Sequence, residues 1–118
     1  MDIQTERVGD ACVVTASGRL DAIYSTAFAN QIGELITGQI PKILIDFTDV
    51  DMVTSAGLRA LLLLMKKASE AHSVFALCGV NAEVREVFDI SGFVGFLSIH
   101  PGRAEGLAAL DVPRYSPK

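Results

Sequence analysis

Two neighbouring hydroxyl residues, Thr54 and Ser55, stand directly before a helical pattern in the middle of the chain. The first turn of a helix has backbone N–H groups without intrahelical partners, and a serine or threonine oxygen can accept one of them. The same N–H groups and the helix dipole favour added negative charge. A serine here is therefore well placed to carry a phosphate, and the simpler alternative is that Ser55 only caps the helix.

Three carboxylates precede this pair, on Asp46, Asp49 and Asp51. They follow a short apolar run and so gather at the carboxyl end of a predicted strand, where α/β proteins place ligands. Such a group can hold Mg²⁺ through carboxylate oxygens. A hydrogen-bonded acidic turn accounts for the same residues equally well.

The remaining reactive side chains give no sign of catalysis. His72 and His100 lack neighbours at metal-ligand spacing and are expected in a loop or at a strand end. Cys12 and Cys78 each lie in an apolar segment, so we expect buried, reduced thiols more than a disulfide or metal pair. The chain has no phosphate-binding glycine loop, and no nucleophile has a general base beside it. We expect no enzyme, no cofactor and no metal site.

Length and composition predict one globular domain over residues 1–110, with a flexible tail over 111–118. The net charge of −4 argues against nucleic acid or an anionic membrane as the partner. No apolar run approaches the roughly 20 residues that a membrane span needs, so we expect no direct membrane insertion. The first residues lack the pattern of a signal peptide, and a cytoplasmic protein is expected.

The central stretch changes its apolar period, which predicts the elements that position Ser55. Residues 42–47 form a short apolar run typical of a buried strand. A polar loop follows, and a helix is predicted over 55–71. A second buried strand is predicted over 74–78, so the two strands should be parallel with a right-handed crossover. The helix is predicted from one apolar stripe, formed by Leu58, Leu61, Leu62, Met65 and Ala68.

The flanking segments complete an α/β layer. Residues 3–8 and 11–17 predict an antiparallel hairpin, after which 18–21 leads out of the sheet. The first helix is expected to be capped by Asp21 or Ser25, and a later one to run from a cap at Asn81 to Gly92. A strand over 96–99 and a helix after Pro101-Gly102 end the domain. The predicted fold is a mixed β-sheet of about five strands covered by about four α-helices.

Four of these segments together resemble the STAS domain family, the anti-sigma-factor antagonists of bacteria. The resemblance covers residues 1–110. It is carried by Gly18-Arg19-Leu20-Asp21, by residues 43–50 (Ile-Leu-Ile-Asp-Phe-Thr-Asp-Val), by Ser55-Ala56-Gly57-Leu58 and by residues 81–93.

The resemblance implies a STAS-like fold and a partner-switching protein. In the unphosphorylated form such a protein binds an anti-sigma factor, typically a serine kinase of the GHKL type. The kinase then phosphorylates the serine at the start of the second helix, and a PP2C-type phosphatase restores it. On this chain the acceptor is Ser55. Thr54 replaces the acidic residue that many relatives have there and is the alternative acceptor.

The resemblance also implies a docking face near that serine, at the loop 49–55 and the first turns of the helix. A larger side chain at Gly57 is expected to impair docking more than stability, and Arg59 lies one helical turn beyond Ser55. Two other functions stay open: a constitutive subunit of a transporter or lipid-trafficking complex, and a nucleotide sensor with a cleft near Asp21, Asp46 and Ser55. A weak homodimer is also compatible with the sequence. The expected partner-binding residues are Asp21, Asp49, Asp51, Met52, Val53, Thr54, Gly57, Leu58 and Arg59.

Overall fold

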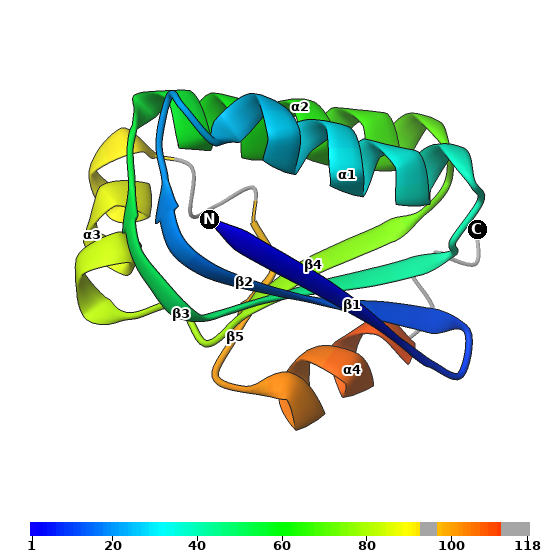
Figure 1. Cartoon of the computed structure of the whole chain (residues 1–118). Coiled ribbons are helices and arrows are strands. Elements are labelled where there is room, and N and C mark those ends of the chain that lie inside the picture. The colour runs from blue at the N-terminus through cyan, green and yellow to red at the C-terminus, as the bar shows by residue number, and fades with distance from the viewer. Residues whose placement is uncertain (93–96, 112–118) are drawn as a thin grey trace.

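The computed structural model describes residues 1–92 and 97–111 and shows a five-stranded mixed sheet with four helices. The strands lie in the order β1-β2-β3-β4-β5 (Figure 1). This confirms the predicted fold class. The elements in chain order are β1 Asp2–Val8, β2 Ala11–Leu20, α1 Ser25–Thr37, β3 Lys42–Val53, α2 Ser55–Glu70, β4 Val74–Cys78, α3 Ala82–Ser91, β5 Ile99–His100 and α4 Arg103–Asp111.

The strand pairing agrees with the sequence pattern. β1 and β2 form the predicted antiparallel hairpin, joined by a turn in which Gly9 has a φ of 62° that glycine adopts readily. β2, β3, β4 and β5 are parallel neighbours. The strand β3, the helix α2 and the strand β4 therefore form the predicted β-α-β unit.

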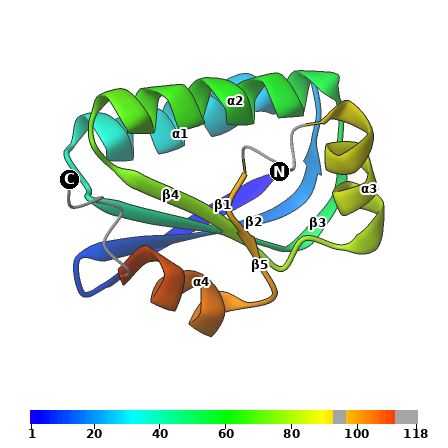
Figure 2. The ribbon, with the colours of Figure 1, turned by 180° about the vertical axis from the view of Figure 1, so that it is seen from behind.

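Helices cover both faces of the sheet. α1 and α2 lie side by side on one face, α4 lies on the other, and α3 stands at one end (Figures 1 and 2). Alternate residues of β3 pack on opposite faces of the sheet, because successive side chains of a strand point to opposite sides. Ile43, Ile45 and Phe47 enter the large core under α1 and α2, whereas Leu44 enters a smaller cluster under α4.

The buried stripe of α2 is shifted from the predicted one. Leu58, Leu61 and Ala68 are buried as expected, but Leu64 is buried as well, while Leu62 and Met65 are only half-buried. The helix packs against α1 as well as the sheet, so its buried face turns toward both neighbours. None of the helices in the described ranges 1–92 and 97–111 is both long and apolar enough to cross a membrane.

The two cysteines are free and buried, which confirms the predicted burial. Cys12 belongs to the large core and Cys78 to the small cluster, so the two thiols lie on opposite faces of the sheet. This arrangement contradicts the alternative of a disulfide or metal pair between them. His72 is exposed after α2, and His100 ends β5, both as predicted.

Two strands are longer than the sequence pattern indicated. β2 continues through Leu20, so residues 18–20 stay in the sheet, and β3 continues through Val53, so most of the predicted loop is a strand. Both corrections have one cause: β2 and β3 remain paired across two register shifts, each with an extra residue on β3. Such bulges bend and twist a strand pair. The two strands curve toward the start of α2 as a result (Figure 1).

The ends of the other elements bear out some predictions and correct others. Asn81 caps α3 by accepting the N–H of Val84 at 2.8 Å, and Gly92 ends that helix in the left-handed conformation, both as predicted. The predicted caps of α1 are wrong, since its N-cap residue is Tyr24 and makes no side-chain capping bond. Asp111, predicted to begin the tail, is the last residue of α4. The fifth strand was predicted over 96–99, but within the described residues it begins only at Ile99 and ends at His100. Residue 96 and the tail beyond 111 lie outside the described residues.

Candidate functional site

The start of α2 lies directly beside the end of β2. Val53 pairs with Leu20 across the two strands, and the N–H of Thr54 donates to the Leu20 carbonyl at 3.0 Å. The chain turns immediately after Leu20, and the Asp21 carboxylate accepts the N–H groups of Ile23 at 3.0 Å and Tyr24 at 3.2 Å. The structure thus brings Asp21 and the Thr54-Ser55 pair to the same end of the sheet.

The two hydroxyl residues have different environments. Thr54 occupies the N-cap position of α2 but makes no capping bond, and its Oγ1 donates to the Leu20 carbonyl at 3.4 Å. Ser55 is the first residue of the helix, is exposed, and makes no side-chain hydrogen bond with any described residue. The prediction of a hydroxyl cap is therefore wrong. The side chain of Ser55 is exposed to solvent at the start of the helix. The Thr54 side chain accepts no hydrogen bond from the first N–H groups of that helix.

Several residues close to Ser55 in the chain are exposed on β3 and α2. Asp49 and Asp51 are exposed on β3, and Met52 keeps 40% of its surface accessible. Arg59 is exposed one helical turn after Ser55 and forms no ion pair with a described residue. A cation at this spacing lies on the same helix face as Ser55.

Three residues expected on the docking face are buried instead. Val53 and Leu58 are 3% and 6% exposed and belong to the large core. Gly57 is buried where α2 approaches β2 so closely that an added Cβ would lie 2.5 Å from the Leu20 carbonyl oxygen. This contradicts the expectation that a larger residue at Gly57 harms docking more than stability. These three residues hold the start of α2 in place and offer no side chain to a partner.

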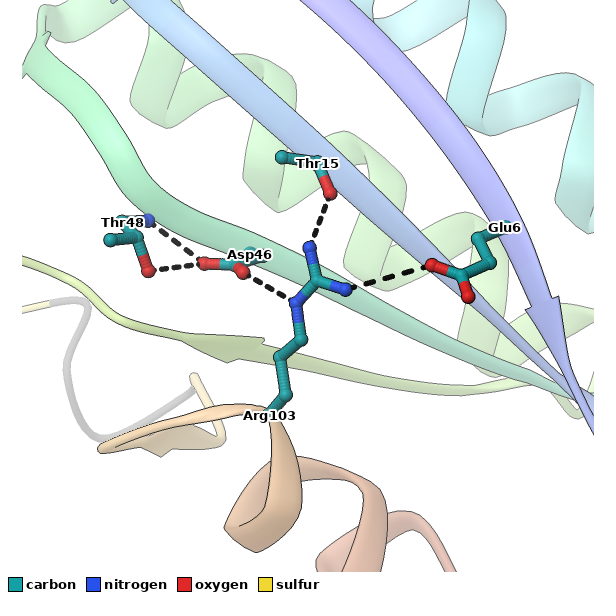
Figure 3. Close-up of polar contacts among 5 residues, drawn as sticks. All are labelled: Glu6, Thr15, Asp46, Thr48 and Arg103. Atoms are coloured by element: carbon teal, nitrogen blue, oxygen red, sulfur yellow. Dashed lines mark hydrogen bonds and ion pairs between the residues drawn. The ribbon is translucent and has the colours of Figure 1, made fainter.

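Asp46 lies in a separate polar cluster, on the face covered by α4. One carboxylate oxygen accepts the backbone N–H of Thr48 at 2.9 Å and its hydroxyl at 2.5 Å, and the other accepts Arg103 Nε at 2.7 Å (Figure 3). Arg103 also donates to the Thr15 hydroxyl at 2.7 Å and faces Glu6 at 3.7 Å. Burial raises the pKa of Asp46, but the hydrogen bonds from Thr48 and Arg103 outweigh it and hold that pKa below 3.8.

These contacts overturn the two ligand sites that the sequence suggested at Asp46. Its oxygens already serve Thr48 and Arg103, and it faces away from the α2 side of the sheet on which Ser55 lies. Asp46 and Ser55 therefore do not share a cleft. Within the part of the chain that the structure describes, no group of three or more acidic, histidine or cysteine side chains could hold a metal ion.

A hollow lined by described residues lies away from Ser55. It has a volume of about 760 Å³ and lies at the carboxyl end of α2, between that helix, β4 and α4. Met65, His72, Phe75 and Leu110 are among its lining residues.

Comparison of sequences identifies relatives over nearly the whole chain. The family model of the STAS domain matches residues 2–106. BtrV of Bordetella bronchiseptica, whose name describes a candidate anti-sigma factor antagonist, is 32% identical over 94 residues, or 76% of this chain and 81% of BtrV. An anti-sigma F factor antagonist of Paenibacillus polymyxa is 26% identical over 113 residues, or 95% of this chain and 97% of that protein.

Comparison of structures finds the same fold in proteins of more than one kind. The anti-sigma factor antagonist SpoIIAA in its unphosphorylated form has a TM-score of 0.80 at 21% identity, covering 97% of this chain and all of SpoIIAA. The phosphorylated form of Bacillus SpoIIAA has a TM-score of 0.71 at 22% identity, covering 92% and 98%. A sulfate transporter family protein from Wolinella succinogenes has a TM-score of 0.75 at 13% identity, covering 89% and 88%.

Proposed function

This chain belongs to the STAS domain family, and from that membership and the geometry around Ser55 we propose that it is an anti-sigma factor antagonist. The names of its relatives from Bordetella and Paenibacillus support this function. The observation that carries the proposal is the exposed Ser55 hydroxyl at the first position of α2. The protein acts by binding a partner and not by catalysis.

Phosphorylation of Ser55 switches this binding. The unphosphorylated protein binds an anti-sigma factor that is a serine kinase of the GHKL type, the kinase phosphorylates Ser55, and a PP2C-type phosphatase removes the phosphate. Phosphate adds about −1.5 to −2 charges and three acceptor oxygens to a surface that must dock. Against an acidic or apolar partner patch this weakens binding by several kcal/mol, or roughly a hundredfold or more.

The folded protein tolerates the phosphate because the start of α2 presents backbone N–H groups to it. Arg59 is exposed one turn further along the helix and forms no ion pair with another described residue, so its guanidinium can pair with the phosphate. Thr54 is a poorer acceptor than Ser55, because Thr54 is half-buried and its hydroxyl contacts the Leu20 carbonyl. SpoIIAA, which has this fold, has been solved in phosphorylated and unphosphorylated forms.

The docking face consists of the exposed groups around Ser55. In this proposal β3 contributes Asp49, Asp51 and Met52 to the face, and α2 contributes Arg59. The half-buried Asp21 lies at its edge. The buried Val53, Gly57 and Leu58 position these groups.

The test is a pull-down from the native host with wild-type, Ser55→Ala and Ser55→Asp baits, followed by mass spectrometry of the captured proteins and of residue 55. Ser69→Asp is the matched control, because it adds the same charge at an exposed position near the other end of α2. A GHKL-type kinase should bind to wild type, Ser55→Ala and Ser69→Asp, and more than tenfold more weakly to Ser55→Asp. Equal capture by both Ser55 variants contradicts the switch.

The second candidate is a STAS subunit that binds its partner constitutively in a transporter complex. The fold shared with the sulfate transporter family protein favours it. In that case all four baits capture the same transport proteins, and Ser55 carries no phosphate.

A further inference from the structure

The last helix, α4, is attached to the sheet differently from α1 and α2. α1 buries Phe28, Ile32 and Ile36, and α2 buries three leucines, so apolar packing holds both. α4 buries only Gly106 and Leu110. The small cluster beneath it contains few side chains, whereas the core under α1 and α2 contains most of the buried residues.

α4 also has little tendency to persist as a helix by itself. It has nine residues, and isolated helices shorter than about 12 residues are marginal in water. Gly106, near its middle, lowers helix propensity further. The glycine lets α4 approach Leu44 closely, since an added Cβ would lie 2.6 Å from Leu44 Cδ1 and that side chain would have to shift. The helix therefore depends on its contacts with the sheet.

Polar contacts at the two ends of α4 add to the packing of Leu107 and Leu110 on the sheet. At the start of α4, Arg103 donates to the buried carboxylate of Asp46 and to Thr15, two residues on neighbouring strands (Figure 3). At its end, the Asp111 carboxylate lies 2.9 Å from Lys42 Nζ, which is equally close to Asp10. Asp111 and Asp10 are exposed, and exposed ion pairs stabilise little. The contact of Arg103 with Asp46 is partly buried and therefore stabilises the closed position of α4 more than the pair of Lys42 and Asp111 does.

We propose that α4 detaches from the sheet as a unit while the sheet and the other helices stay folded, and that the contact between Arg103 and Asp46 controls this opening. Regions with few buried apolar contacts open locally at a lower free energy than global unfolding. Opening uncovers an apolar strip on the sheet, formed by Val13, Leu44, Ala76 and Cys78. This inference concerns the face of the sheet opposite the Ser55 side and does not depend on the proposed function.

The two cysteines report on this opening independently. Cys78 lies under α4, and burial followed by the negative charge of Asp46 raises the pKa of its thiol to about 11. Cys12 lies in the large core on the other face, and burial raises the pKa of its thiol too. Both thiols are therefore protonated and inaccessible at neutral pH in the closed protein. Release of α4 exposes Cys78 alone, whereas global unfolding exposes both.

The experiment measures the labelling rate of each cysteine by a thiol reagent at neutral pH without denaturant, assigned by peptide mass spectrometry. In wild type, Cys78 should react faster than Cys12. Arg103→Gln should accelerate labelling of Cys78 at least tenfold and leave Cys12 within about twofold of wild type, because it removes the charged donor from Asp46. Arg85→Gln, which removes the exposed pair with Asp89 on α3, is the control and should change neither rate.

Thr15→Val is a milder second variant, since valine suits a strand and only one hydrogen bond to Arg103 is removed. It should accelerate labelling of Cys78 in the same direction and by less. Equal labelling rates of the two cysteines in wild type, equal acceleration of both in the variants, or no acceleration of Cys78 in either variant would overturn the proposal.

Discussion

Asp46 and Ser55 lie in the same strand-and-helix unit, yet the Asp46 carboxylate is buried and hydrogen-bonded whereas the Ser55 hydroxyl is exposed and unbonded among the described residues. The Asp46 carboxylate is 7% exposed and accepts three hydrogen bonds, from Thr48 and Arg103. The Ser55 hydroxyl is exposed and bonds to no described residue. A side chain whose bonding capacity is filled within the protein supports the fold, whereas one left open toward solvent is available to a partner. Asp46 is therefore a structural residue, whereas Ser55 is open to the role in partner binding that we propose for it.

The largest expected effect comes from the packing that holds Ser55 in place. Gly57→Leu should lower the free energy of unfolding by about 3 kcal/mol, because the side chain collides with the backbone and side chain of Leu20. Urea denaturation measures this loss. Ala56→Leu at the neighbouring half-buried position is the control and should cost less than about 1 kcal/mol. Equal, small losses would mean that α2 can move away from β2 freely.

The next largest change in stability is expected at the hydrogen-bonded carboxylate of Asp46, in contrast to the exposed carboxylate of Asp49. Asp46→Asn should lower the free energy of unfolding by about 2 kcal/mol, because hydrogen bonds to the charged form from Thr48 and Arg103 are weakened. Asp49→Asn, on the same strand but exposed, should change it by less than about 0.5 kcal/mol. A similar cost for both substitutions would remove the contrast between a structural and an open carboxylate.

The same carboxylate should make stability depend on pH. The pKa of Asp46 is below its ordinary value of 3.8 in the folded protein, so the unfolded chain binds the proton at a higher pH than the folded one. Its contribution to stability is complete well above pH 3.8 and is lost as the pH falls through the folded-state pKa. The difference in unfolding free energy between wild type and Asp46→Asn, measured by urea titration, should stay constant from about pH 7 to 5 and shrink below pH 3.8. A difference that grows at low pH would contradict the pKa direction.

The smallest effect on stability is expected at Ser55. Ser55→Asp places a negative charge at the start of α2 and should raise the free energy of unfolding by about 0.3–1 kcal/mol at low salt. Thermal unfolding at low and high salt measures this gain, which salt should reduce. Ser69→Asp, near the carboxyl end of the same helix, should have the opposite sign. A marked loss of stability in Ser55→Asp would mean that this position supports the fold and not a switch.

The sequence by itself determined the features that depend on near neighbours. Apolar period predicted the mixed sheet, the β-α-β unit around β3, α2 and β4, and the burial of both cysteines. The cap at Asn81 was predicted from one side chain three residues before the N–H that it accepts. The position of Ser55 at the start of α2 belongs to the same group. Each of these features is decided within a few residues, by alternation, helical spacing or a local hydrogen bond.

The tertiary structure alone decided which polar groups are free. Nothing near Asp46 in the chain shows that Arg103, 57 residues later, bonds to its carboxylate. Nothing near Gly57 shows that Leu20 leaves no room for a side chain. The continued pairing of β2 with β3, which turned a predicted loop into strand, also joins distant segments. Such contacts depend on segments that only the folded chain brings together, and they decide which polar groups are bonded within the protein and which stay open to solvent.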